Sequence, residues 1–131
     1  MPKTVRITTE VYSTLQVEGQ HCWPECPFDE VSYLRDPHRH MFHVKAYKKV
    51  NHDDRDIEFI MLKHELERYF RLTWYNYLLN LCDFKNMSCE MIAKELISKF
   101  DLSSCEVSED GENGAIVTVE QEIVQSETAP Q

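Results

Sequence analysis

Hydrophobic and polar residues alternate along the start of the chain, which is the pattern of a strand with one buried face. In residues 4–19, TVRITTEVYSTLQVEG, the apolar residues at odd positions are Val5, Ile7, Val11, Leu15 and Val17. Residues 20–37 contain three prolines and show no period, so we expect a loop there. Residues 38–50, HRHMFHVKAYKKV, are predicted to form a second strand, and the polar residues 51–56 a turn.

The hydrophobic period becomes helical after residue 56. Residues 57–70 are predicted to form a helix with Asp56 as its N-cap. The residues that carry the helical period are Phe59, Leu62, Leu66 and Phe70. A second helix is predicted over residues 88–100, with Ser88 as its N-cap. The apolar segment 72–86 between them is interpreted as the end of the first helix and a packed connection.

Two more strands are predicted at residues 104–110 and 114–124, joined by a hairpin at GENG, residues 111–114. The resulting order, β-β-α-α-β-β, predicts an α+β fold. In that fold an antiparallel four-stranded sheet carries two helices on one face. We expect a single domain over residues 1–121 and a flexible C-terminal tail over residues 122–131.

The composition is that of one folded domain, with 131 residues, 42% of them hydrophobic and 28% charged. The net charge of −9 argues against broad binding to nucleic acid or anionic membranes, because their phosphates would be repelled on average. No apolar run has the length of a membrane span, and the first residues lack the apolar core of a signal peptide. An odd number of cysteines, five, is typical of a compartment that keeps thiols reduced. We therefore expect a cytoplasmic protein with no nucleic-acid or membrane partner.

Three of the six histidines, His38, His40 and His43, lie within six positions. Side chains alternate between the faces of a strand, so His38 and His40 share one face and His43 lies on the other. Two imidazoles on one face can bind the same ion at about 2.0–2.1 Å. A catalytic zinc site commonly has three protein ligands and one open position, and His21 can supply the third ligand. The sequence therefore predicts a zinc (Zn2+) site at His21, His38 and His40.

Two other interpretations of these residues stay open. Histidines on a strand can be merely hydrogen-bonded, or can bind a structural ion that ties two strands together. The set Cys22, Cys26, His38 and His43 also comes within one residue of the zinc-finger spacing. A zinc finger needs its histidines on a helix in the DNA major groove, whereas these lie in a β-like run of an acidic chain, so we disfavour it.

Six short motifs resemble one known family: VEGQH, PHRHMFHV, DIEF, LLN, SCEMIAKEL and VSEDGENGA. They occur in the order of the motifs of the 6-pyruvoyltetrahydropterin synthase and 6-carboxytetrahydropterin synthase family, and the resemblance spans about residues 5–120. It implies the tunnelling fold (T-fold), with the element order predicted above. It also implies a homo-oligomer, a hexamer or a tetramer, with active sites between subunits.

The resemblance implies roles for particular residues. The family's zinc-binding histidines match His21, His38 and His40 in GQH and HRH. A glutamate that anchors the pterin ring in the family matches Glu109, and a carboxylate can accept two parallel hydrogen bonds from a 2-amino-pyrimidinone edge. The family's pocket-lining PTSE corresponds to MSCE, which keeps a hydroxyl at Ser88.

The chain also departs from the family. The cysteine that serves as the base shortly before the histidine pair is missing from VSYLRDP. The nearest substitutes are Cys26 and Glu30, with Cys22 and Asp29 beside them. Tyr75 and Asn76 stand where the family has the aspartate and histidine of its proton relay, and neither replaces a His–Asp pair near neutral pH.

Two functions follow as hypotheses from the resemblance. The first is a zinc-dependent lyase that acts on a 7,8-dihydropterin triphosphate, with Cys26 or Glu30 as a substitute catalytic base. The second is a non-catalytic protein that binds a pterin or a purine-like ligand and has lost the relay. A structural zinc protein is a third, simpler interpretation.

Overall fold

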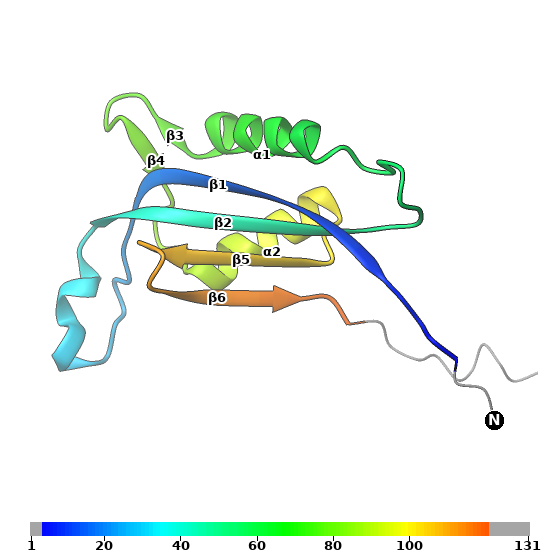
Figure 1. Cartoon of the computed structure of the whole chain (residues 1–131). Helices are drawn as coiled ribbons and strands as arrows, with labels where there is room; N and C mark the ends of the chain where they lie inside the picture. Colours follow the sequence, from blue (N-terminus) through cyan, green and yellow to red (C-terminus); the bar gives the residue numbers. More distant parts are fainter. Residues whose placement is uncertain (1–3, 121–131) are drawn as a thin grey trace, which may run out of the picture.

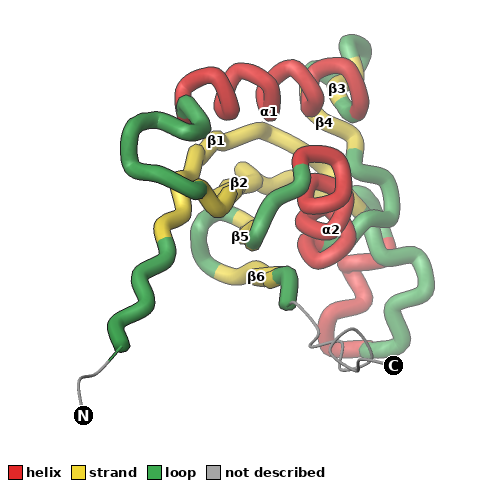
Figure 2. Tube along the Cα trace, turned by 90° about the vertical axis from the view of Figure 1, so that its right-hand side faces the viewer, coloured by secondary structure: helices red, strands yellow, loops and turns green. Residues whose placement is uncertain are grey.

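The computed structural model describes residues 4–120, which form a mixed α+β architecture built on one six-stranded sheet (Figure 1). The strands are β1 (Thr9–His21), β2 (His38–Val50), β3 (Tyr75–Asn76), β4 (Leu81–Asp83), β5 (Ser104–Glu109) and β6 (Asn113–Thr118). They lie side by side in the order β3-β4-β1-β2-β5-β6 and are antiparallel except for β1 and β4. The helices are a short 3₁₀ helix, η1 (Asp29–Arg35), and two α-helices, α1 (Phe59–Thr73) and α2 (Cys89–Phe100). Both α-helices pack against the same face of the sheet (Figure 2).

The α+β class is as predicted, but the sheet has six strands and not four, and the described residues contain a third, short helix. The additional strands β3 and β4 form within residues 72–86, which the sequence analysis interpreted as a helix end and a connection. Strands of two and three residues are too short to show an alternating pattern. The third helix, η1, lies inside the predicted loop 20–37.

The long strands and helices lie close to their predicted positions. The strand predicted from residue 4 begins at Thr9, because its partner β2 ends at Val50, which pairs with Thr9. The N-cap of α1 is Glu58 and not Asp56: the Glu58 side chain accepts hydrogen bonds from two backbone amides of the first turn, whereas Asp56 accepts one from Asn51. Within residues 4–120, neither α-helix nor η1 has the length and apolar character needed to cross a membrane.

The predicted hairpin joins β5 and β6. Asp110 and Gly111 both adopt positive φ angles, 58° and 71°, which is the backbone geometry that tight hairpins favour. Strand β6 ends at Thr118, before the predicted end at residue 124. Residues 121–131, which include the predicted tail, lie outside the described part of the chain.

One hydrophobic core lies between the sheet and the two α-helices. Its fully buried members include Phe42, Val44, Leu66, Phe70, Phe84, Ile92, Leu96, Cys105 and Val107. Gly19 leaves room for this packing, because a Cβ at that position would lie 2.5 Å from the Phe84 ring. The ring of Phe42 packs against Phe84 at a centroid distance of 4.8 Å. Its centroid also lies 5.1 and 5.8 Å from those of His21 and His40, with the ring planes nearly perpendicular, so the core packs next to these histidines.

Ser88 is the N-cap of α2, as predicted: its Oγ accepts a hydrogen bond of 3.2 Å from the amide of Met91. Replacing Ser88 by alanine is expected to lower the free energy of unfolding by about 1 kcal/mol, because the amide loses its partner. Urea unfolding measures this loss. Ser88→Asn keeps a capping oxygen and is expected to stay close to wild type. Equal losses in both variants would contradict the capping role.

Candidate metal centre

Four potential metal ligands, His21, His38, His40 and Glu109, meet where β1 ends, β2 begins and β5 ends (Figure 1, left end of the sheet). We call these four residues the metal-site cluster. The strand register brings them together, because His21 pairs with His38 across β1 and β2, and Glu109 pairs with Phe42 across β2 and β5. Each residue offers one ligand atom, and these atoms lie within 4.8 Å of one another. Sequence reasoning placed the three histidines together, and the structure adds the Glu109 carboxylate to them.

The three imidazoles are oriented by oxygen atoms on their outer sides. Each Nδ1 lies within hydrogen-bond distance of one oxygen: the Met87 carbonyl at 2.8 Å for His21, the Asp36 carbonyl at 2.9 Å for His38 and Asp110 Oδ2 at 2.8 Å for His40. Carbonyl and carboxylate oxygens only accept, so each Nδ1 carries a hydrogen and donates it. In a neutral ring the lone pair then lies on Nε2, which is the arrangement of metal-binding histidines.

The carboxylate of Glu109 faces two of these Nε2 atoms. Its Oε2 lies 2.8 Å from Nε2 of His21, and its Oε1 lies 3.4 Å from Nε2 of His40. Both Nε2 atoms are buried, and neither has a partner aligned as a hydrogen bond requires. Nitrogen lone pairs that face carboxylate oxygens repel them unless a positive charge lies between, either a proton or a metal ion. Imidazole nitrogens and a carboxylate are ligands that suit zinc, so the donor set fits this metal.

The electrostatics of His21 and Glu109 are coupled. Burial lowers the pKa of His21, but the Glu109 carboxylate and the Met87 carbonyl outweigh it and raise that pKa above its ordinary value of 6.5. The contact with His21 lowers the pKa of Glu109 below its ordinary value of 4.5, against the opposing effect of partial burial. Without metal, the pair stabilises the fold fully between these two ordinary values. The stabilisation is lost as the pH rises through the raised pKa of His21 or falls through the lowered pKa of Glu109.

Replacing Glu109 by glutamine in metal-free protein is therefore expected to cost the most stability between about pH 4.5 and 6.5, because the charged pair makes its full contribution in that range. The measurement is urea unfolding of chelator-treated wild type and variant at about pH 3.5, 5.5 and 8.5. The difference between the two proteins is expected to shrink at both extremes. A difference that does not change with pH would contradict the ion pair.

A cavity of about 500 Å³ borders the cluster. His21, His38 and Glu109 line it on one side, and Ser88 and Glu90 from the start of α2 line it on another. Ser88 and Glu109, the two residues predicted to bind substrate, therefore border the same space. No lysine or arginine among residues 4–120 lines the cavity.

The residues predicted to be catalytic lie elsewhere in this chain. Cys26 is buried in the β1–β2 connection, where its Sγ contacts the carbonyls of Phe28 and Val31 at 3.8 and 3.7 Å. Glu30 is exposed on η1, and neither Cys26 nor Glu30 lines the cavity.

Two other thiols do line the cavity, those of Cys22 and Cys89. The Sγ of Cys89 lies 4.0 Å from Glu109 Oε2. Burial raises the pKa of Cys89 to about 12, with a further contribution from the charges of Glu109 and Glu90, so the thiol stays protonated at neutral pH. Sequence analysis did not assign Cys89 to the site, although its place next to the helix cap Ser88 could have indicated it.

The remaining histidine of the motif region, His43, lies apart from the cluster. His43 and Arg39 occupy the opposite face of β2, where Arg39 pairs with Glu18. A zinc finger would need His38 and His43 to bind one ion from a helix, but they lie on opposite faces of a strand. The structure therefore contradicts the zinc-finger interpretation.

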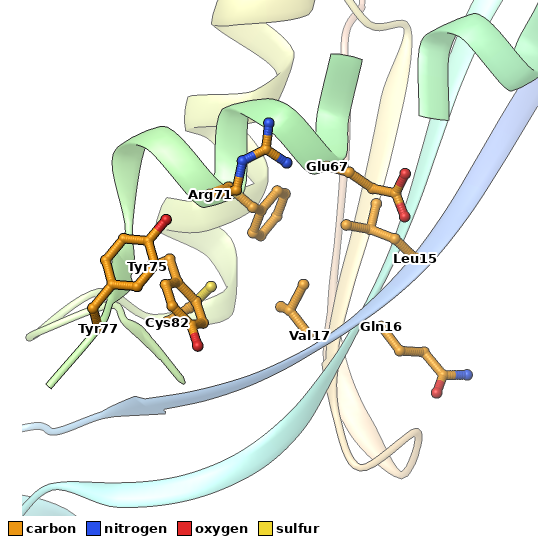
Figure 3. Close-up of a pocket in the computed structure, with 9 residues that line it drawn as sticks. Leu15, Gln16, Val17, Glu67, Arg71, Tyr75, Tyr77 and Cys82 are labelled. Atoms are coloured by element: carbon orange, nitrogen blue, oxygen red, sulfur yellow. The ribbon is translucent and has the colours of Figure 1, made fainter. Parts of the chain in front are cut away.

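A second cavity, of about 400 Å³, lies between α1, β1 and the β3–β4 hairpin (Figure 3). Apolar side chains such as Leu15 and Phe70 line it together with Arg71 and Tyr75. Tyr75, which the sequence resemblance matches to one of the two proton-relay positions, lines this second cavity. None of the four residues of the metal-site cluster lines it, so the candidate chemistry lies at the first cavity.

Asp110 holds His40 in place from the β5–β6 turn. Its Oδ2 accepts from Nδ1 of His40, its Oδ1 accepts from the amide of Met41 at 3.0 Å, and its own amide donates to the Met41 carbonyl at 2.7 Å. Replacing Asp110 by alanine is expected to lower zinc affinity about 10–100-fold, the usual effect of losing such an outer partner. Competition with a chromophoric chelator measures the affinity. Glu112→Ala in the same turn is the control, and equal affinities in the two variants would contradict this role.

Comparison with known proteins gives no family assignment. No protein-family model matches the chain, and no curated protein matches it. Support for a function therefore comes from the geometry of the cluster and from the motifs of the sequence.

Proposed function

We propose that the protein is a zinc-dependent pterin enzyme that resembles 6-pyruvoyltetrahydropterin synthase and 6-carboxytetrahydropterin synthase, and that acts as a lyase on a 7,8-dihydropterin triphosphate. One observation carries the proposal: three imidazoles with anchored Nδ1 atoms turn toward one carboxylate at the edge of a cavity of about 500 Å³. When bound, zinc would polarise the hydroxyl and carbonyl oxygens of the substrate side chain and make the neighbouring protons more acidic.

Different residues of the chain bind the metal and the substrate. His21, His38 and His40 hold the metal, and the Met87 carbonyl, the Asp36 carbonyl and Asp110 keep their rings oriented. Glu109 accepts hydrogen bonds from the paired N–H donors of the pterin ring. The Ser88 oxygen accepts from the Met91 amide, which leaves its hydroxyl hydrogen free to donate to a ligand in the cavity.

A T-fold homo-oligomer, a hexamer or a tetramer, in the cytoplasm is part of this proposal. The sheet supports assembly because its edges can pair: β3 and β6 are edge strands, and β4 pairs with β1 at Gly19 and Gln20 only. The unpaired part of β1 is a long strand edge that a second copy could extend. Because Cys26 and Glu30 lie outside the cavity, the base would come from Cys22, which lines it, or from a second copy.

The second candidate function is a non-catalytic pterin-binding protein, and two observations favour it. Neither Cys26 nor Glu30 lines the cavity, and the Cys89 thiol, which does line it, stays protonated at neutral pH. The lining also has no lysine or arginine among residues 4–120 to pair with a triphosphate.

Incubation of zinc-loaded protein with 7,8-dihydroneopterin triphosphate, followed by chromatography, separates these functions. The lyase predicts loss of the triphosphate and a new pterin product, and the His38→Ala variant is expected to form none. If the substrate stays unchanged but binds saturably, the protein is the non-catalytic pterin-binding protein and not the lyase. The absence of both turnover and binding would contradict both functions.

A further inference from the structure

The Glu109 carboxylate lies among the ligand atoms of the three histidines. Its two oxygens face Nε2 of His21 and of His40 at 2.8 and 3.4 Å. Its ligand atom belongs to the same group, within 4.8 Å, as those of the three histidines. Three imidazoles and one carboxylate supply four ligands, which is the number of a closed tetrahedral site.

The same side chain also borders the cavity. Glu109 is 28% exposed and is the last residue of β5, directly before the hairpin turn. Its Oε2 has a weak thiol donor nearby, the Sγ of Cys89 at 4.0 Å. Rotation about its side-chain bonds can therefore carry the carboxylate from the histidines toward the cavity without a change in the strand.

One carboxylate cannot fully satisfy both partners. Paired hydrogen bonds to a ring edge use both oxygens of Glu109, and these are the oxygens that now face the two Nε2 atoms. A ligand that offers two parallel N–H donors therefore competes with the metal for Glu109.

We propose that Glu109 is a fourth metal ligand in the ligand-free protein and that a heterocycle with paired N–H donors draws it away, which opens one coordination position. This inference rests on the proposed metal centre and adds one property to it: the metal binds an outside ligand more tightly once the ring is bound. The carboxylate thereby links occupancy of the cavity to access to the metal.

The test uses protein loaded with Co2+, whose visible spectrum reports its ligands, and thiocyanate as the outside ligand. Without a pterin, wild type is expected to bind thiocyanate weakly. Saturating 7,8-dihydroneopterin, which lacks the triphosphate, is expected to tighten thiocyanate binding about 5–150-fold, the usual range of coupling between two sites. Glu109→Ala and Glu109→Gln are expected to bind thiocyanate tightly without the pterin, whereas Glu112→Ala should behave as wild type.

The outcomes separate this inference from the proposed function. Failure to bind Co2+ would overturn the metal centre, and the inference with it. Bound Co2+ with equally tight thiocyanate binding in wild type and in Glu109→Ala would overturn only the inference. Thiocyanate binding that does not respond when dihydroneopterin saturates the protein, or dihydroneopterin that fails to bind, would also overturn the inference and leave the metal centre standing.

Discussion

Replacing His38 by alanine is expected to abolish stoichiometric zinc binding. Wild type should retain about one zinc per chain after dialysis, as a three-histidine site does. The variant should retain close to none. His38 is held by the Asp36 carbonyl next to it, and its ring centroid lies 4.5 and 5.1 Å from those of His21 and His40. Its loss removes a proposed direct ligand, so the effect should exceed the roughly 10–100-fold expected for an outer partner such as Asp110.

The matched control for His38 is His43 on the same strand. His43 lies on the opposite face of β2, so His43→Ala is expected to keep its zinc. Metal analysis after dialysis measures both variants. Added zinc at 100 times its Kd should also stabilise wild type by about 2.7 kcal/mol and leave His38→Ala unchanged. Equal zinc contents in the two variants would show that the strand faces do not determine the site.

Replacing Phe42 by alanine is expected to cost about 3–5 kcal/mol of unfolding free energy, the usual cost of truncating a buried phenylalanine. Phe42 is 0% exposed, and its ring packs between Phe84 in the core and the edges of His21 and His40. A loss of this size is a large part of the total stability of a domain, about 5–15 kcal/mol. We expect zinc affinity to fall as well, because two ligand rings lose the surface that supports them.

Met41→Ala is the control for Phe42. Met41 is the preceding residue of β2 and lies on the exposed face, so truncating it is expected to change stability by no more than about 0.5 kcal/mol. Urea unfolding compares the two variants. A cost below about 1 kcal/mol for Phe42→Ala would contradict its place in the core.

Alternation and helical periodicity were enough to predict the main elements. Residues 38–50 were predicted as a strand and form β2 with the same bounds, and the buried residues Phe42, Val44 and Ala46 of that strand alternate with less buried ones, as the pattern indicated. The second helix begins directly after Ser88, because the serine side chain defines that end. The pattern could not predict β3 and β4, since they are held by pairing with each other and with the end of β1.

The candidate site was predictable in part. Alternation alone separates His38 and His40 from His43. That His21 pairs with His38 depends on the β1–β2 register, which a connection of irregular sequence does not reveal. Glu109 entered the sequence analysis only through the family resemblance, as a ring anchor, and its approach to the histidines comes from the pairing of β2 with β5.

Other features of the site had no signal in the sequence. The contact between Asp110 and His40 depends on the positive φ angle of the hairpin turn, which turns the carboxylate back toward β2. The positions of Cys26 and Glu30 depend on how the proline-containing connection folds, and neither hydrophobic period nor spacing describes such a segment.

X-ray absorption of the zinc-loaded protein tests the central claim most directly, namely that His21, His38 and His40 bind one metal ion. The account predicts a first shell of nitrogen and oxygen atoms at about 2.0–2.2 Å with the outer-shell scattering of three imidazoles, a signal that His38→Ala is expected to lose together with its zinc. A shell that contains sulfur at about 2.3 Å, or a spectrum that His38→Ala leaves unchanged, would contradict it.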